Sequence, residues 1–157
     1  MEDIFLLATP LHSQNFISTD DGVRLWSEDL AEAADLAIVA PATANIIGKM
    51  ANGIADDFLS TELLAMTCPV VIAPAMNVRM WLHRATQRNI ATLRADDIRF
   101  VGPNEGDMAC GEYGPGRMAE PEEIFAAIGA RLGQTGRLAG RRVIVTSGPT
   151  HEPDWCT

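Results

Sequence analysis

Short apolar runs that each end at or near a proline or glycine are the feature that most constrains how this chain can fold. Four such runs occur, at residues 35–41 (DLAIVAP), 69–74 (PVVIAP), 98–103 (IRFVGP) and 141–149 (RRVIVTSGP). Each run is short and rich in β-branched residues, which is typical of a buried strand. The sequence therefore predicts four strands at these positions.

Segments with helical signals lie between these runs, at residues 44–53, 57–66, 82–95 and 120–133. Gly53 is a typical residue at the end of a helix, and Asp56 is placed to cap the helix that follows. The last segment opens with proline and acidic residues and closes with Arg131 and Gly133, as helix polarity favours.

Strands that alternate with helices predict a parallel α/β sheet. Ligands bind such sheets outside the carboxyl ends of the strands. The segments that follow the strands are therefore the candidates for a site: 41–45 (PATAN), 74–81 (PAMNVRMW) and 103–118. The last of these holds four glycines and has no periodicity, which favours a lid, a binding loop or a disordered segment.

Composition narrows the class of protein. The chain has 157 residues and a net charge of −9, which fits one domain and argues against a nucleic-acid or anionic-membrane surface. A phosphorylated small molecule needs only one local site and stays allowed. Cys68, Cys110 and Cys156 have no metal-ligand spacing, so we expect no metal site and reduced thiols in a cytoplasm-like compartment. No apolar run is long enough to span a bilayer.

The polar residues after the strands each have a structural and a functional interpretation. Thr43 and Asn45 either cap the following helix or lie against a bound phosphate or flavin edge. Asn77 is either a turn residue or an amide that reads a carboxylate or ring edge between Met76 and Met80. Methionines in such positions are more often core filler than ligand contacts.

The cysteines are interpreted by their surroundings. Cys110 lies in the glycine-rich segment, where a reactive thiol is plausible, although a free cysteine is usually buried and inert. Cys68 precedes a proline at the start of a predicted strand, and we interpret it as structural.

Taken together, three motifs resemble the homo-oligomeric flavin-containing cysteine decarboxylases, and in particular those that act on 4'-phospho-N-pantothenoylcysteine. They are residues 40–61 (APATANIIGKMANGIADDFLST), 74–81 (PAMNVRMW) and 108–121 (MACGEYGPGRMAEP). Residues 140–153 (GRRVIVTSGPTHEP) resemble the opening of the phosphopantothenate–cysteine ligase domain to which the bacterial decarboxylase is fused.

The resemblance implies a Rossmann-like, flavodoxin-like three-layer flavoprotein without its first βα unit. It implies residues 1–133 as the flavoprotein domain, 134–140 as a linker and 141–157 as the start of a truncated ligase domain. The implied reaction is FMN-dependent decarboxylation of 4'-phospho-N-pantothenoylcysteine to 4'-phosphopantetheine in coenzyme A synthesis. The resemblance also implies that the protein forms a homotrimer or a higher homo-oligomer in the cytoplasm.

The resemblance also implies roles for particular residues. The implied catalytic residues are Asn77, which holds the substrate carboxylate, Met80, which shapes that site, and Cys110, which donates a proton. The implied FMN contacts are Thr43, Asn45, Ala75 and Met76. Arg117 is implied to bind substrate together with Asn77.

Two departures from the family pattern leave alternative functions open. Counting back from Pro41 places Ser27 where the family carries a histidine, and no glycine- and serine-rich phosphate turn precedes that proline. The alternatives are a non-catalytic regulatory or assembly module of the same fold, and a decarboxylase of peptidyl cysteines. The Gly-Pro-Gly-Arg-Met segment and the ligase-like terminus favour the pantothenate reaction.

Overall fold

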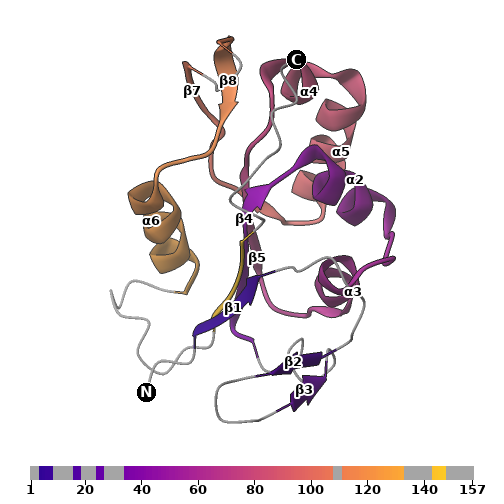
Figure 1. Cartoon of the computed structure of the whole chain (residues 1–157). Helices are drawn as coiled ribbons and strands as arrows, with labels where there is room; N and C mark the ends of the chain where they lie inside the picture. Colours follow the sequence, from indigo (N-terminus) through magenta and orange to yellow (C-terminus); the bar gives the residue numbers. More distant parts are fainter. Residues whose placement is uncertain are drawn as a thin grey trace.

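A five-stranded parallel sheet lies at the centre of the fold (Figure 1). The computed structural model describes residues 4–8, 16–18, 24–26, 34–107, 111–132 and 143–147. The sheet strands are β1 (Ile4–Ala8), β4 (Leu36–Ala42), β5 (Val70–Pro74), β6 (Arg99–Phe100) and β9 (Val143–Ser147). Their order across the sheet is β1-β9-β4-β5-β6, and every neighbouring pair is parallel. The predicted parallel α/β class is confirmed.

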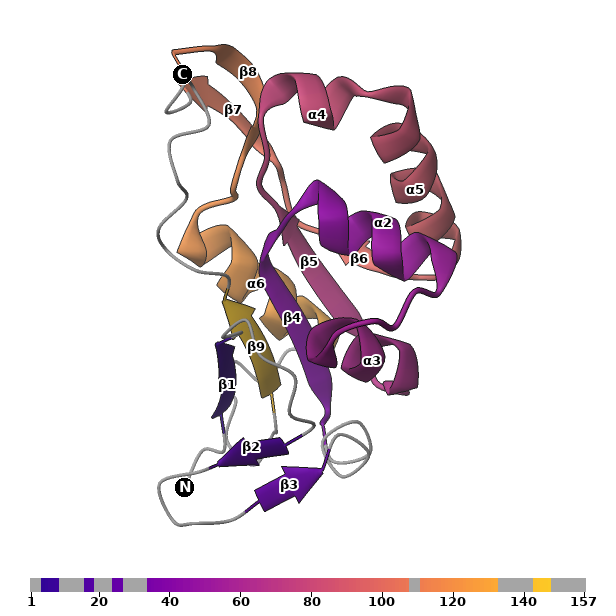
Figure 2. The same cartoon turned by 45° about the vertical axis from the view of Figure 1, so that its right-hand side comes forward.

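Helices cover both faces of the sheet and complete three layers (Figure 2). Helices α2 (Ala44–Asn52), α3 (Phe58–Ala65) and α5 (Arg84–Ala95) lie on one face, and α6 (Pro121–Leu132) lies on the other. The short α4 (Val78–Leu82) follows β5 directly and lies beyond its carboxyl end.

The alternation of side chains along β4 and β5 divides the core between these two faces. Ala37, Val39 and Ile72 belong to a buried cluster with residues of α2 and α5. Leu36, Ile38 and Val71 belong to a second cluster, with Ile128 of α6 and Val143 of β9. Because both faces are covered, these strands read as continuous apolar runs rather than as alternating ones.

Two antiparallel pairs lie outside the main sheet. One joins β2 (Phe16–Ser18) to β3 (Arg24–Trp26). The other, the β7–β8 hairpin, joins β7 (Asn104–Asp107) to β8 (Tyr113–Arg117). The prediction of an aperiodic loop over residues 103–118 was therefore wrong for most of its length. β8 could not be predicted from the sequence, because its glycines and proline interrupt the alternation of apolar and polar residues that is typical of a strand.

The helix ends confirm one prediction and correct another. Gly53 adopts the left-handed conformation, with φ of 62°, and ends α2 as predicted. The N-cap of α3 is Asp57 rather than Asp56, because the Asp57 carboxylate reaches the backbone N–H of Ser60 and the Ser60 hydroxyl accepts the N–H of Asp57. Asp56 instead pairs with Lys49 at 2.6 Å.

The segment predicted as one helix over residues 82–95 is divided. Helix α4 ends at Leu82 and α5 begins at Arg84, with His83 between them as the cap of both. The Nδ1 atom of His83 accepts the backbone N–H of Ala85 at 3.2 Å. His83 is exposed, and its local role is to begin α5 rather than to lie within it.

The predicted strand near residue 141 is present as β9, between β1 and β4. Val143 pairs with Ile4 on one side and with Leu36 on the other. The strand at residues 4–8 was not among those predicted. The assignment of residues 141–157 to a ligase domain stays a prediction, and the predicted linker at 134–140 lies outside the described residues.

Candidate functional site

The carboxyl ends of β4 and β5 bring two polar turns side by side. Ala42 pairs with Pro74 in the sheet, and the backbone N–H of Ala75 donates to the carbonyl of Ala42 at 3.0 Å. The turn after β4 therefore begins beside the turn after β5. The predicted site residues Thr43, Asn45, Ala75, Met76 and Asn77 are all brought to this edge.

The turn after β4 exposes a hydroxyl and an amide. Thr43 is the N-cap of α2, and its Oγ1 accepts the backbone N–H of Ile46 at 3.4 Å. Asn45 is exposed, and its side chain forms no hydrogen bond within the described part of the chain. The structural interpretation is confirmed for Thr43, which caps α2. The functional interpretation stays a prediction, for which the exposed Asn45 amide is available.

Asn77 makes two side-chain hydrogen bonds that fix the direction of its amide. Its Oδ1 accepts the backbone N–H of Arg79 at 2.8 Å, which caps α4. Its Nδ2 donates to Glu112 Oε2 at 2.8 Å. Because the acceptor end is occupied locally, the end that faces the β7–β8 hairpin presents only N–H donors. Such an end recognises an acceptor, and a carboxylate is the strongest acceptor among common ligand groups.

The β7–β8 hairpin packs closely on α4. The backbone N–H of Met76 donates to the carbonyl of Gly116 at 3.0 Å. Gly114 has φ of +155°, and a Cβ added there would lie 2.8 Å from Val78 Cγ2. Glycine is therefore required at residue 114 for both conformation and space.

The base of the hairpin is tied to the start of α6. The amide of Asn104 donates to Glu123 Oε2 at 2.6 Å, and the same carboxylate oxygen accepts the backbone N–H of Glu120 at 2.9 Å. These two bonds lower the pKa of Glu123. Arg117 pairs with Glu120 here rather than with Asn77, so its role in substrate binding stays a prediction.

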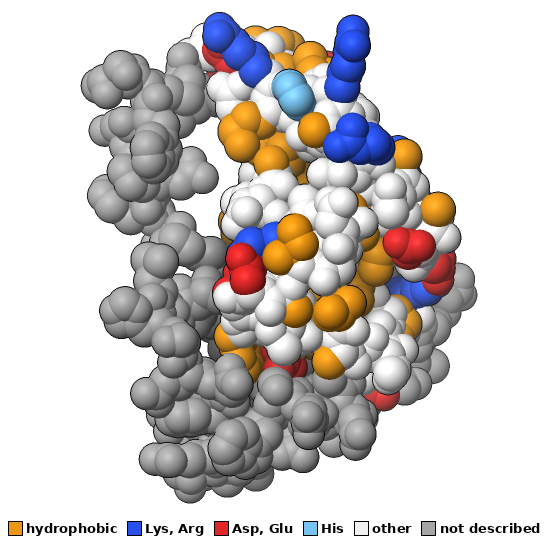
Figure 3. Space-filling model, turned by 90° about the vertical axis from the view of Figure 1, so that its right-hand side faces the viewer, with side chains coloured by type: hydrophobic (Ala, Val, Ile, Leu, Met, Phe, Trp, Pro, Cys, Tyr) orange, Lys and Arg blue, Asp and Glu red, His pale blue; other side chains and the backbone are white. Residues whose placement is uncertain are grey.

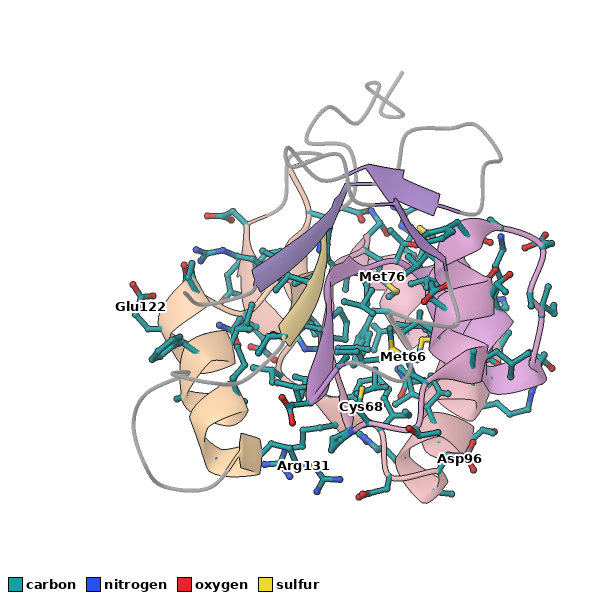
Figure 4. All side chains as sticks on the ribbon, turned by 90° about the horizontal axis from the view of Figure 1, so that it is seen from below. Met66, Cys68, Met76, Asp96, Glu122 and Arg131 are labelled. Atoms are coloured by element: carbon teal, nitrogen blue, oxygen red, sulfur yellow. The ribbon has the colours of Figure 1, made fainter. Side chains whose placement is uncertain are left out.

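The sulfur side chains near the site divide between core and surface. Met66, Cys68 and Met76 pack against the cluster on the helix-rich face, and Figure 4 shows all three between the sheet and those helices. Met80 is 48% exposed and stands at the surface of α4. Burial raises the pKa of the Cys68 thiol, which agrees with its structural interpretation. Cys110 and Ser27 lie outside the described residues.

Arg79 and Glu112 also belong to this site, although no sequence pattern identified them. Arg79 forms an ion pair with Glu112 Oε1 at 2.6 Å, while Asn77 holds the other oxygen of the same carboxylate. Glu112 is the second residue after Cys110, so an acidic residue within the predicted binding loop was the signal that could have identified it.

Basic residues gather beside this site although the chain as a whole is acidic. Helices α4 and α5, with the residue between them, expose Arg79, His83, Arg84 and Arg88. In the space-filling view, basic side chains and a histidine cluster at the upper end of this face (Figure 3). A local surface of this kind favours an anionic ligand.

Within the described residues, no helix combines the length and the apolar character needed to cross a membrane.

A model of the flavoprotein family matches residues 6–133 of the chain. The coenzyme A biosynthesis bifunctional protein CoaBC of Bacillus subtilis (strain 168) is 54% identical over 126 residues, which are 79% of this chain. The chain spans 31% of the length of that relative.

Solved structures resemble the fold as well. A PPC decarboxylase variant complexed with pantothenoylaminoethenethiol superposes with a TM-score of 0.64 and 34% identity, covering 71% of this chain and 63% of that one. The FMN-dependent cysteine decarboxylase SpaF gives a TM-score of 0.58 and 39% identity, covering 74% of this chain and 62% of that one.

Proposed function

The chain belongs to the flavoprotein family, and from that membership we propose that it is the FMN-binding decarboxylase part of a coenzyme A biosynthesis protein. The proposed reaction converts 4'-phospho-N-pantothenoylcysteine to 4'-phosphopantetheine and carbon dioxide. The observation that carries this proposal is the Asn77 amide, whose N–H donors face the β7–β8 hairpin and bind a carboxylate there, that of Glu112. The reaction removes the substrate carboxylate as carbon dioxide, so the enzyme must first recognise that carboxylate.

The residues at the strand ends fit the ring of a flavin. Thr43 and Asn45 are exposed at the start of α2 and offer a hydroxyl and an amide to the polar ring edge. Ala75 and Met76 offer small or apolar contact to the ring face. When bound, FMN supplies a reversible hydride acceptor for the cysteine moiety of the substrate. We assign no described residue to the phosphate arm.

The substrate is held, in this proposal, by residues of the turn after β5 and of the hairpin. Asn77 donates to the substrate carboxylate, and Met80 forms an apolar wall beside it. Arg117 would have to leave Glu120 to reach the substrate. The exposed cations of α4 and α5 support an anionic, phosphorylated ligand.

The hairpin closes the site and carries the proton donor. Residues 108–112 join β7 to β8 in the sequence, and Cys110 among them is the proposed donor of the proton that completes the product. A hairpin that packs on α4 keeps water away from a reactive intermediate.

We further propose a homotrimer or higher homo-oligomer in the cytoplasm. This proposal rests on the resemblance to the homo-oligomeric cysteine decarboxylases. Size-exclusion chromatography with light scattering tests this proposal, and a monomer at all concentrations would contradict it.

The reaction is tested with purified, FMN-loaded protein by release of carbon dioxide from 4'-phospho-N-pantothenoylcysteine. We expect Asn77→Asp to lose about 100-fold in rate, because a second carboxylate repels the substrate. Asn52→Asp, in an exposed position at the end of α2, is the matched control.

Cys110→Ser is expected to abolish product formation, and Cys68→Ser is its control. A protein that takes up no FMN would end the cofactor proposal. A Cys110→Ser variant as active as the parent would end the assignment of the proton donor.

A further inference from the structure

Glu112 fills the position that the proposed function gives to the substrate carboxylate. One of its oxygens accepts the Asn77 amide at 2.8 Å, and the other lies 2.6 Å from the Arg79 guanidinium. The carboxylate comes from the β7–β8 hairpin, and its two partners come from the cap and the first turn of α4, 35 residues away in the case of Asn77. Asn77 and Arg79 thus form a binding site for a carboxylate, and the side chain of Glu112 from the same chain occupies it.

The two partners differ in how firmly they are held. Asn77 is half-buried and its amide is oriented by the bond to the Arg79 backbone, so it stays in place when its partner leaves. Arg79 has a side chain that is 84% exposed, so it can follow either an internal or an external carboxylate. Glu112 covers the Asn77–Arg79 pair from the hairpin side, and its side chain is only 26% exposed. A ligand carboxylate can reach the pair only if the Glu112 side chain moves away.

We propose that Arg79 and Glu112 are specificity-determining residues: Glu112 occupies the Asn77–Arg79 pair in the unliganded chain, and only a ligand that brings a carboxylate displaces it. This inference rests on the proposed function, since it assumes that Asn77 receives the substrate carboxylate. The exchange replaces one carboxylate by another, so Asn77 and Arg79 are never left without an acceptor.

The exchange has a consequence for selectivity. A ligand with the same pantothenoyl arm and no carboxylate cannot take the place of Glu112 and leaves the hairpin closed. The decarboxylated product is such a ligand, so Glu112 regains the site once the carboxylate is gone. The hairpin therefore distinguishes substrate from product through one side chain.

Hydrogen exchange of the FMN-loaded protein tests the internal contact without any ligand. In Glu112→Gln and in Arg79→Gln we expect the amides of Tyr113–Arg117 to exchange about threefold to tenfold faster. The matched controls are Glu105→Gln on the exposed face of the same hairpin and Arg84→Gln on α5. Both controls should leave this exchange unchanged. Arg79 and Arg84 are exposed, so neither variant is expected to disturb the fold.

Two ligands that differ only in the carboxylate test the competition: 4'-phospho-N-pantothenoylserine and 4'-phospho-N-pantothenoylethanolamine. Neither has a thiol, so turnover does not interfere with calorimetry. Glu112→Gln should bind the serine ligand about threefold to tenfold more tightly than the parent and the ethanolamine ligand equally well. Arg79→Gln should gain nothing for the serine ligand, because it loses a contact to both carboxylates.

The results separate this inference from the function on which it rests. The role of Glu112 would be overturned if Glu112→Gln bound both ligands more tightly by the same factor. It would also be overturned if neither the affinity for the serine ligand nor the hydrogen exchange of the hairpin changed. If no variant bound either ligand, the proposed function would fail. The exchange rates of Glu112→Gln against Glu105→Gln would then still decide whether Glu112 fills the Asn77–Arg79 pair.

Discussion

The turns after β4 and β5 lie side by side and begin in the same way, yet they are held by different parts of the molecule. Each places a capping side chain before a helix, Thr43 in one and Asn77 in the other. Helix α2 has nine residues and buries Ile46 and Ile47, whereas α4 has five residues and buries none. The first turn is thus held by its own helix in the core. The second also packs Met76 against the core, but it leads into a helix without buried residues that contacts the β7–β8 hairpin. Contacts with the hairpin can be exchanged for a ligand without unfolding the sheet.

The largest expected effect comes from removing the core contact of the first turn. Ile47 is completely buried, so Ile47→Ala should lower the free energy of unfolding by about 2–5 kcal/mol. Met80→Ala, in the helix of the second turn, should cost less than about 1 kcal/mol because Met80 is 48% exposed. Urea denaturation measures both. Equal losses would break the comparison between the two turns.

The next effect concerns the close approach of the hairpin to α4. Gly114→Ala adds a methyl group that meets Val78 and forces an unfavourable φ, at a cost of about 1–3 kcal/mol. We expect faster hydrogen exchange in the hairpin and little change in the sheet. Gly129→Ala is the control: a Cβ there meets nothing within 4 Å, and α6 should gain up to about 1 kcal/mol. Unchanged exchange in Gly114→Ala would show that the hairpin does not depend on this contact.

A smaller effect is expected at the cap of the first turn. Thr43→Ala removes the acceptor for the Ile46 N–H and should lower the unfolding free energy by about 1 kcal/mol. Thr43→Ser keeps the hydroxyl and should restore most of that stability. Thermal unfolding of the two variants and the parent measures the difference. If Thr43→Ala were as stable as the parent, the cap would contribute nothing and the residue would be free for a ligand alone.

The smallest effect is the dependence on pH of the link between α2 and α3. Burial disfavours the charge on Asp57, but the hydrogen bonds from Lys49 and Ser60 outweigh it and lower the pKa. A lowered pKa means that the stabilisation is complete above the unfolded value and is lost as the pH falls through the folded value. Asp57→Asn should therefore be less stable than the parent at about pH 7, and the difference should shrink at about pH 3. Urea denaturation at both values measures this, and a difference independent of pH would contradict it.

Local signals predicted the elements, whereas contacts distant in sequence had to be observed. β4 and β5 could be predicted from their β-branched residues, and the end of α2 from Gly53. Each of these signals depends only on residues close by in the sequence. The cap of α3 was misplaced by one residue because Asp56 and Asp57 are adjacent, and only the geometry of Ser60 shows which one reaches the backbone.

The candidate site shows the same division. The strand-end rule located Asn77, and it lies at the predicted edge of the sheet. Its partner Glu112 is 35 residues away, on a hairpin whose Gly-Pro-Gly strand has no strand-like pattern. The position of β9 between β1 and β4 likewise depends on pairing partners that are more than 100 residues away, which no local pattern encodes.

The central place of β9 has a consequence for how the molecule is made. Residues 36–100 can pair β4, β5 and β6 early in synthesis, but the edge of β4 that receives β9 stays open until residue 147 has been added. At about 5–20 residues per second, the ribosome leaves that edge open for several seconds. Pairing between such distant segments is slow, and an open strand edge invites association with other chains. The yield of native protein should therefore depend more on how quickly β9 is synthesised than on the helices that form first.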